Sequence, residues 1–383
     1  MSEPTDHYLP DPNILERKVA DYLSRSNEGG GDEWRGRSVA EAAEMQRLIR
    51  WSVVWAAVAG IVSGSLIGGV ETWMHLEILD GDGDAGDAVW REQLPIWAGF
   101  FAFAGVISAV EILFLYVLTI HGTAKLSNRS GIALGHDGFP ALFNQGLVRA
   151  ALDLPNPRVL VFGVDPYAYM PGWWIAVRNI AYKMKVGVSS FLLRIFLRRV
   201  MGRMAIRGLI PLIAGPLYAL WNGIIVWRVM SEARLRTLGP FAVEDLLRQV
   251  SKEEERPGPE AVEVIMHGVG EMLMRGHDAH PNQVLLLSRL RQDFNYEREA
   301  IDVDWERQRT ALRSLECGEQ EAALKLLTLS SILGRRTYRQ QKKFLREAHD
   351  DCGLTLKPER LKHLRTKLKE GRTITPDDYA SVR

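Results

Sequence analysis

Cysteine is scarce in this sequence, with only Cys317 and Cys352 among 383 residues. Two thiols cannot form a disulfide framework or a four-cysteine zinc site. Both lie in a polar, helix-forming stretch, so we expect free thiols in a reducing compartment. Alternating runs of β-branched residues are almost missing as well, and this absence predicts an all-α fold without strands.

The familiar sequence signatures of catalysis are also missing. The chain has no phosphate-binding loop, no Gly-x-Ser-x-Gly elbow, no His-Glu-x-x-His pair and no dinucleotide fingerprint. The densest group of metal-ligating residue types consists of His267, His277, Asp278 and His280. Because Pro281 follows directly, we expect a loop between helices here, and we predict neither a metal nor another cofactor. The prediction is a protein without enzymatic activity.

Charged residues are absent from long parts of the chain. Residues 51–70 carry none, residues 94–120 carry only Glu111, and residues 209–227 carry none. Twenty helical residues span about 30 Å, the thickness of the hydrocarbon core of a bilayer. The first two stretches therefore predict an integral membrane protein with a transmembrane hairpin.

The residues that flank this hairpin predict its orientation. Arg47 and Arg50 precede the first apolar stretch, Lys125 and Arg129 follow the second, and acidic residues dominate the connecting loop. Positively charged flanks remain in the cytoplasm. We therefore expect a protein of the bacterial inner membrane with both termini in the cytoplasm.

Small residues line one face of each predicted transmembrane helix. In the first, the helix-packing residues are Gly60, Gly64 and Gly68, whose spacing lets another backbone approach closely. In the second, the matching residues are Ala98, Ala102, Gly105 and Ala109. We expect the two faces to pack as a hairpin, with oligomerisation toward a pore as the alternative. We expect Glu111 to pair with Arg47 or Arg50, with a functional role as the alternative.

Acidic residues are absent from residues 166–231, where basic and large apolar residues alternate at helical spacing. This pattern is typical of a helix that lies at an anionic lipid surface. The predicted lipid-binding residues are Arg178, Lys183, Lys185, Arg194, Arg198, Arg199, Arg203 and Arg207. The stretch is more aliphatic than a soluble nucleic-acid-binding face, so we expect anionic headgroups as its partner and no nucleic acid.

The third uncharged stretch, residues 209–227, poses a question of topology. A complete crossing would place the basic residues that follow it outside the cell, against the positive-inside rule. Pro211, Gly215 and Pro216 would also interrupt a straight helix. We expect a re-entrant or embedded segment; the alternative is a crossing that pairs with a span around residues 173–197.

Beyond Gly239 and Pro240 the composition becomes that of a soluble helical bundle. Apolar residues recur at helical spacing over residues 242–250, 261–274, 283–294, 300–315, 320–333, 337–349 and 359–368. Four domains are therefore predicted: a polar, partly disordered N-terminal segment (1–46), a transmembrane hairpin (47–125), a basic interfacial and membrane-embedded region (126–238) and a cytoplasmic helical domain (239–383).

Residues 320–378 combine a leucine pattern with glycines at Gly334, Gly353 and Gly371. This stretch resembles the TerB-like helical family named for tellurite resistance. The family's Ala-Asp-Gly turn is replaced here by Leu333, Gly334 and Arg335. The resemblance therefore implies a helical fold but not the acidic residues that would bind metal. The membrane region resembles uncharacterised bacterial membrane proteins coupled to such domains, and that resemblance implies no activity.

These features favour a membrane-anchored adaptor or scaffold whose cytoplasmic helical domain binds a protein partner or a second copy of the chain. The alternative is a subunit of a channel or transporter, built from the glycine-faced helices and the proline-containing segment. A lipid-modifying enzyme is the third possibility, and it would need a buried acid–base pair that the sequence does not reveal.

Overall fold

A computed structural model describes residues 11–26, 39–77, 87–130, 141–157, 159–174, 177, 210–251 and 256–382. These residues are mostly helical and contain no strand, which confirms the all-α prediction. The chain forms two compact units, each assembled from separate stretches of sequence. We name residues 47–122 and 172–230 the apolar unit, and residues 1–46, 123–171 and 231–383 the helical unit.

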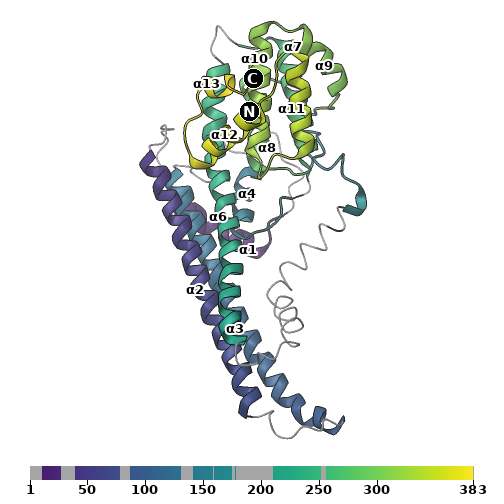
Figure 1. Cartoon of the computed structure of the whole chain (residues 1–383). Helices are drawn as coiled ribbons and strands as arrows, with labels where there is room; N and C mark the ends of the chain where they lie inside the picture. Colours follow the sequence, from purple (N-terminus) through teal and green to yellow (C-terminus); the bar gives the residue numbers. More distant parts are fainter. Residues whose placement is uncertain are drawn as a thin grey trace. The chain divides into compact units, whose positions relative to one another are not determined.

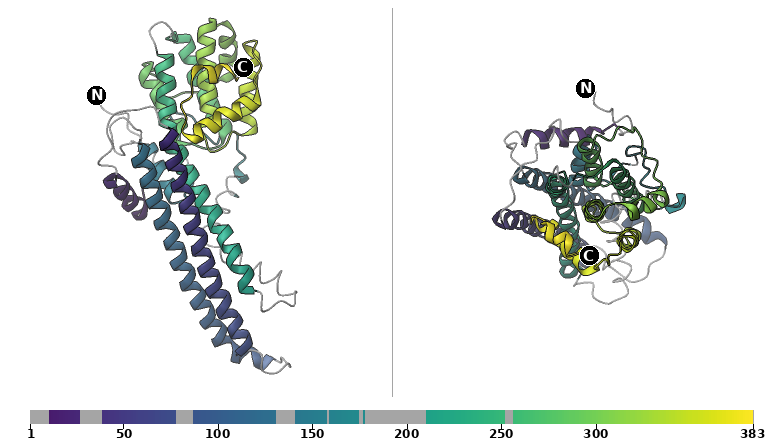
Figure 2. Two further views of the ribbon diagram at one scale, coloured as in Figure 1. Left: turned by 60° about the vertical axis from the view of Figure 1, so that its left-hand side comes forward. Right: turned by 90° about the horizontal axis from the view of Figure 1, so that it is seen from above.

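The apolar unit contains most of α2 (Val39–Glu77), most of α3 (Asp87–Ser130) and the first half of α6 (Ile210–Val250). These stretches of the three helices lie side by side (Figures 1 and 2). α2 and α3 pack through Ile67, Met74, Phe100 and Ala104. Within the described residues, Glu41–Met74 and Leu94–Ser130 are long and apolar enough to cross a membrane.

α6 lies antiparallel to α2 within the apolar unit. A Cβ atom on Gly64 would lie 2.5 Å from the Tyr218 ring, and one on Gly60 would lie 2.6 Å from the Tyr218 backbone. Further along α6, a Cβ atom on Gly223 would lie 3.5 Å from the Val53 side chain. Residue numbers therefore rise along α6 as they fall along α2.

Ser52 of α2, Gly122 of α3 and Met230 of α6 meet at one end of this unit. A Cβ atom on Gly122 would lie 2.6 Å from the methyl carbon of Met230 and 3.6 Å from the hydroxyl of Ser52. The apolar stretch of α2 therefore begins at the level where those of α3 and α6 end.

The small residues pack differently from the prediction. On α3, the predicted face is exposed at Ala98, Ala102, Gly105 and Ala109. Phe100 and Ala104 contact α2 instead, so the prediction for that face is wrong. The close approach that Gly60 and Gly64 allow is made by α6, and Gly68 is buried. A row of glycines permits close packing, but it does not specify which helix uses it.

α6 is continuous from Ile210 to Val250, against two expectations. Pro211 lies in the first turn, where its missing amide donor costs little. The helix also continues through Pro216, Gly239 and Pro240. The predicted interruption at residues 211–216 and the predicted border at Gly239 are therefore wrong. Packing along α6 outweighs the cost of an interior proline, about 3 kcal/mol.

The helical unit has its core around α7 (Pro259–Gly276). α7 packs against α8 (Pro281–Asp293), α9 (Trp305–Ser314), α10 (Cys317–Leu333) and α11 (Arg339–Asp351). α12 (Pro358–Glu370) packs against α10, and α13 (Pro376–Ala380) follows. The predicted helices of this part are confirmed, except that residues 242–250 belong to α6 and that α9 begins only at Trp305, where the Asp304 side chain caps it.

Two further helices, α1 (Ile14–Ser26) and α4 (Ala141–Ala151), pack against each other in the helical unit. α4 also packs against α8. Residues 123–171 thus group with the helical unit. The structure therefore divides the region predicted as residues 126–238, because its first part packs with α1 and α8 of the helical unit.

Candidate functional site

The structure describes only some of the predicted site residues. Outside the described residues lie the predicted lipid-binding residues Arg178, Lys183, Lys185, Arg194, Arg198, Arg199, Arg203 and Arg207. Just before them, Trp173 and Trp174 are exposed and stacked, with ring centroids 4.8 Å apart.

The histidine-rich group does not form one site. His267 lies in α7 beside Glu263, at 3.4 Å, whereas His277 follows the end of α7. Asp278 accepts a hydrogen bond from Asn156, and His280 contacts α6. The described part of the chain holds no cluster of three potential metal-ligating residues.

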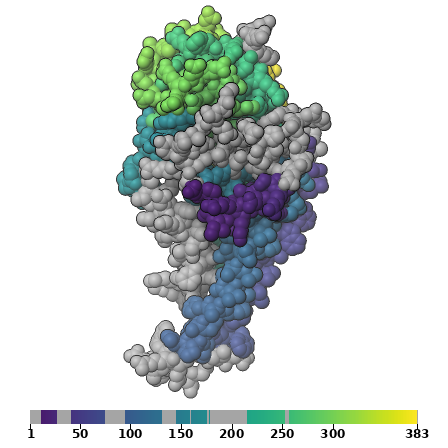
Figure 3. Space-filling view, turned by 180° about the vertical axis from the view of Figure 1, so that it is seen from behind, coloured from purple at the N-terminus to yellow at the C-terminus, as the bar shows by residue number. Residues whose placement is uncertain are grey.

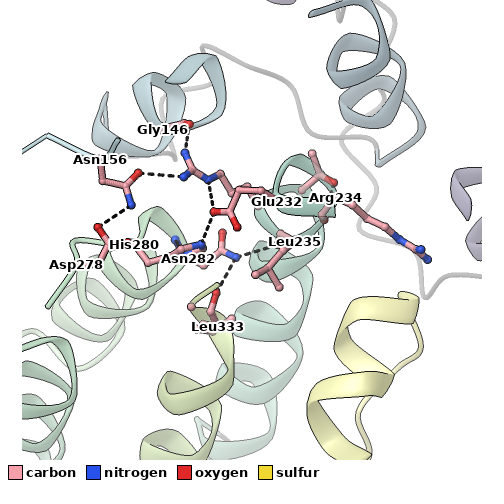
Figure 4. Close-up of polar contacts among 12 residues, drawn as sticks. Gly146, Asn156, Glu232, Arg234, Leu235, Asp278, His280, Asn282 and Leu333 are labelled. Carbon is pink, nitrogen blue, oxygen red and sulfur yellow. Dashed lines mark hydrogen bonds and ion pairs between the residues drawn. The ribbon is translucent and has the colours of Figure 1, made fainter. Parts of the chain in front are cut away.

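A buried polar cluster connects α6 to α4 and α8, and Figure 4 shows its contacts. We name it the α6 junction; its members are Glu232, Arg236, Asn156, His280 and Asn282. Arg236 donates hydrogen bonds to Glu232 at 3.0 Å, to the side-chain oxygen of Asn156 at 3.0 Å and to the Gly146 carbonyl. One guanidinium group therefore holds α6, α4 and the segment after α4 together.

His280 belongs to this junction because it caps α8. Its Nδ1 accepts a hydrogen bond from the backbone N–H of Asn282 at 3.3 Å. We therefore assign the ring proton to Nε2, which lies 3.1 Å from the Glu232 carboxylate. The residue that caps the N-terminus of α8 is thus also a residue that binds α6.

The electrostatics of the junction depend on Glu232. Burial raises the pKa of this carboxyl, but the positive charge of Arg236 and the hydrogen bond from His280 outweigh burial and lower the pKa from 4.5 to about 2. Arg365 and Lys369 of α12 also interact with this carboxylate. Glu232 is therefore ionised at neutral pH and balances the buried charge of Arg236.

Asn282 explains the glycine in the middle of α6. Its side-chain amide donates hydrogen bonds to the carbonyls of Leu235, at 2.9 Å, and Leu333, at 3.4 Å. This amide occupies the space where a Cβ atom on Gly239 would lie. Gly239 is thus a packing position between α6, α8 and α10.

Arg234 extends the polar contacts of α6 in another direction, away from the junction (Figure 4). It donates hydrogen bonds to the Gln46 side chain at 2.6 Å and to the Glu370 carbonyl at 3.0 Å. The same turn of α6 therefore also binds the first part of α2 and the end of α12.

A second polar contact lies within the apolar unit. The amide of Asn222 in α6 donates a hydrogen bond to the Glu111 carboxylate in α3 at 2.6 Å, and both side chains are buried. The sequence suggested Arg47 or Arg50 as partners of Glu111, but its observed partner is Asn222, because α3 packs beside α6 at this level.

The role of Glu232 was not predicted either, although its position in the sequence is distinctive. It is the first acidic residue after the acid-free stretch of residues 166–231, and Arg236 follows it by one helical turn. His280 and Asn156 carry no comparable signal, because they reach the junction only through the tertiary fold.

Comparisons with known proteins do not identify a family or a function for this chain. No family model, no curated protein and no solved structure matches the chain. Chemically, the α6 junction provides ion pairs and a helix cap between protein groups, and the Glu111–Asn222 contact places an ionisable group between two apolar helices.

Proposed function

We propose that the protein is a membrane-anchored adaptor, in which α2, α3 and α6 hold the chain in a bilayer and the helical unit binds a protein partner. The observation that carries this proposal is the apolar surface of α2 and α3. In their most apolar windows, only 33% and 6% of the residues are buried within the described structure. The core helix of a soluble protein buries such residues, whereas a transmembrane helix exposes them to lipid.

One end of the apolar unit, where Ser52, Gly122 and Met230 meet, supports a cytoplasmic location of the helical unit. Basic residues cluster near this level on all three helices, and they include Arg50, Lys125 and Arg228. By the positive-inside rule this end of the apolar unit faces the cytoplasm. Because α6 runs antiparallel to α2 along the apolar unit, we propose that residues 209–227 cross the bilayer completely and do not form a re-entrant segment.

The continuity of α6 supports an adaptor. Its first half belongs to the apolar unit and its second half to the helical unit. Glu232 and Arg236 bind the second half to α4 and α8. A chain built in this way connects a partner of the helical unit to the membrane, and the TerB-like resemblance of residues 320–378 stays a prediction about that unit.

The test is co-purification after mild crosslinking in native membranes. The proposal expects the full-length chain to recover a protein in constant ratio. The control is a chain truncated after Ser251, which keeps α2, α3 and α6 and is expected to lose that protein. A full-length chain that recovers no protein contradicts the adaptor.

The Glu111–Asn222 contact favours one other candidate, a subunit of a channel or transporter. Ionisable residues buried among transmembrane helices commonly mark ion or substrate pathways. Ion flux through proteoliposomes that contain the full-length chain, and its loss in the Glu111→Gln variant, would favour this alternative. Equal leakage from both proteoliposomes and from empty liposomes would favour the adaptor.

A further inference from the structure

Among the described residues, α1 packs against the rest of the helical unit through one of its faces. That face carries Glu16, Val19 and Leu23, all of which are buried. Glu16 forms an ion pair with Arg149 of α4 at 2.7 Å. Because this pair is largely shielded from water, the orientation of α1 on α4 is well determined.

The other face of α1 exposes large apolar side chains. Ile14 is 74% exposed, Leu15 is 52% exposed and Tyr22 is 41% exposed. Figure 3 shows α1, the darkest purple segment, uncovered on the face turned to the viewer. Helical spacing places Lys18, Asp21 and Arg25 on the same side as Ile14 and Tyr22, so this face is apolar and carries two basic residues against one acidic residue.

We propose that α1 is a surface helix that binds an anionic lipid bilayer. Ile14, Leu15 and Tyr22 enter the boundary between headgroups and acyl chains, and Lys18 and Arg25 contact the headgroup phosphates. Helices that bind in the plane of a membrane combine an apolar face with Lys and Arg in this way. Tyr is also enriched at the membrane–water interface.

Charge and position in the chain favour lipid over a protein partner. α1 exposes three basic residues, Arg17, Lys18 and Arg25, against one acidic residue, Asp21. This positive balance suits a negatively charged surface. α1 precedes α2 in the sequence, and α4, to which it is fixed, follows α3. Along the chain, α1 is therefore next to α2 and α4 is next to α3, and we propose that α2 and α3 cross the bilayer. The inference about α1 rests on that proposal.

The experiment uses the full-length chain in nanodiscs of phosphatidylglycerol, with Cys317→Ser and Cys352→Ser to remove the native thiols. An environment-sensitive fluorophore is attached at Ile14→Cys or, as the matched control, at Ser24→Cys, which lies on the polar side of α1. Lipids that carry a quencher in the upper acyl chain are then introduced. We expect about twofold lower fluorescence at position 14 and little change at position 24.

A charge variant tests the lipid class. Lys18→Glu combined with Arg25→Glu is expected to reduce the quenching at position 14, and so is replacement of phosphatidylglycerol by phosphatidylcholine. Unchanged quenching in both cases contradicts the anionic contact.

The remaining outcomes separate this inference from the proposed function. A chain that stays in the nanodisc but is not quenched at position 14 overturns the surface helix alone. Fluorescence at position 14 that depends on protein concentration, and not on the quencher, assigns the face to a second copy and also overturns it. A chain that does not co-elute with nanodiscs contradicts the membrane anchor, and the surface helix with it.

Discussion

Gly60 of α2 lies against the backbone of Tyr218 in α6, whose carbonyl carbon and oxygen are 2.6 Å from the position of a Cβ atom on residue 60. Because these obstructing atoms belong to the backbone, a rotamer change cannot make room for a side chain. A side chain at residue 60 would have to displace α6 itself. Gly60 and Gly64 therefore serve the contact with α6, whereas the sequence predicted α3 as their partner.

Replacing Gly60 with alanine should weaken the apolar unit. The added methyl group overpacks the α2–α6 contact, at a cost of about 1–3 kcal/mol. Thermal unfolding of the protein in detergent should show a lower midpoint. Gly69→Ala is the matched control on α2, since no atom of another described element lies within 4 Å of its Cβ position, and it should leave the midpoint unchanged or raise it. Equal losses in both variants would contradict the proposed contact.

Glu232→Gln should destabilise the helical unit strongly. The variant leaves Arg236 buried without a counter-charge, and removing one partner of a buried ion pair costs about 3–5 kcal/mol. Denaturant unfolding of the full chain measures this loss. The control is Glu347→Gln, which removes a more exposed pair with Lys343 at 3.7 Å and should cost less than about 1 kcal/mol. If Glu232→Gln lowers the free energy of unfolding as little as the control does, the buried ion pair does not stabilise the α6 junction.

The stability of the helical unit should fall in acid because of the same carboxyl. The pKa of Glu232 is about 2 in the folded protein, against an ordinary value of 4.5. A lowered pKa stabilises the fold fully above the ordinary value, and this contribution, roughly 3 kcal/mol, is lost as the pH falls from about 4.5 to about 2.

Unfolding midpoints recorded across this pH range test the titration of Glu232. The wild-type protein should lose more stability toward acid than Glu232→Gln, which has no carboxyl to protonate at this position. Parallel pH profiles of the two proteins would assign the acid sensitivity to other groups.

The hydrogen bond between Asn222 and Glu111 should couple α6 to α3. A double-mutant cycle with Asn222→Ala and Glu111→Ala should give a coupling free energy of about 1 kcal/mol, since hydrogen bonds between transmembrane helices are modest. Unfolding in detergent gives the four values that the cycle requires. Additive losses would show that the two side chains do not interact in solution.

The sequence predicts the helices of this protein better than their contacts. The periodicity of α7 and α10, and the proline and glycine residues that bound the helices, lie within short windows that local reasoning can interpret. The role of Gly239 could not be predicted locally, because it depends on Asn282, which is distant in the sequence and close in space. The partner of Gly60 was missed for the same reason: a small residue reports that something approaches closely, and only the fold shows that it is Tyr218.

Part of the α6 junction could be predicted from the sequence. Glu232 and Arg236, one turn apart, form a local pair that a helical reading can find. His280 was noticed as a potential metal ligand, whereas the structure shows it as the cap of α8 and a partner of Glu232. Residue type alone does not distinguish these roles, because the imidazole ring suits a metal and a carboxylate equally well.

Labelling of Cys317 in intact cells with a membrane-impermeant maleimide tests whether the protein lies in a membrane with its helical unit in the cytoplasm. Cys317 is exposed, whereas burial raises the pKa of Cys352 to about 11, so the thiolate that reacts is mainly that of Cys317. The Cys317→Ser variant should therefore lose most of the label in denaturant-free, permeabilised cells. The wild-type chain should be labelled only after permeabilisation. Labelling of Cys317 in intact cells would place the helical unit outside the cell and contradict the proposed topology.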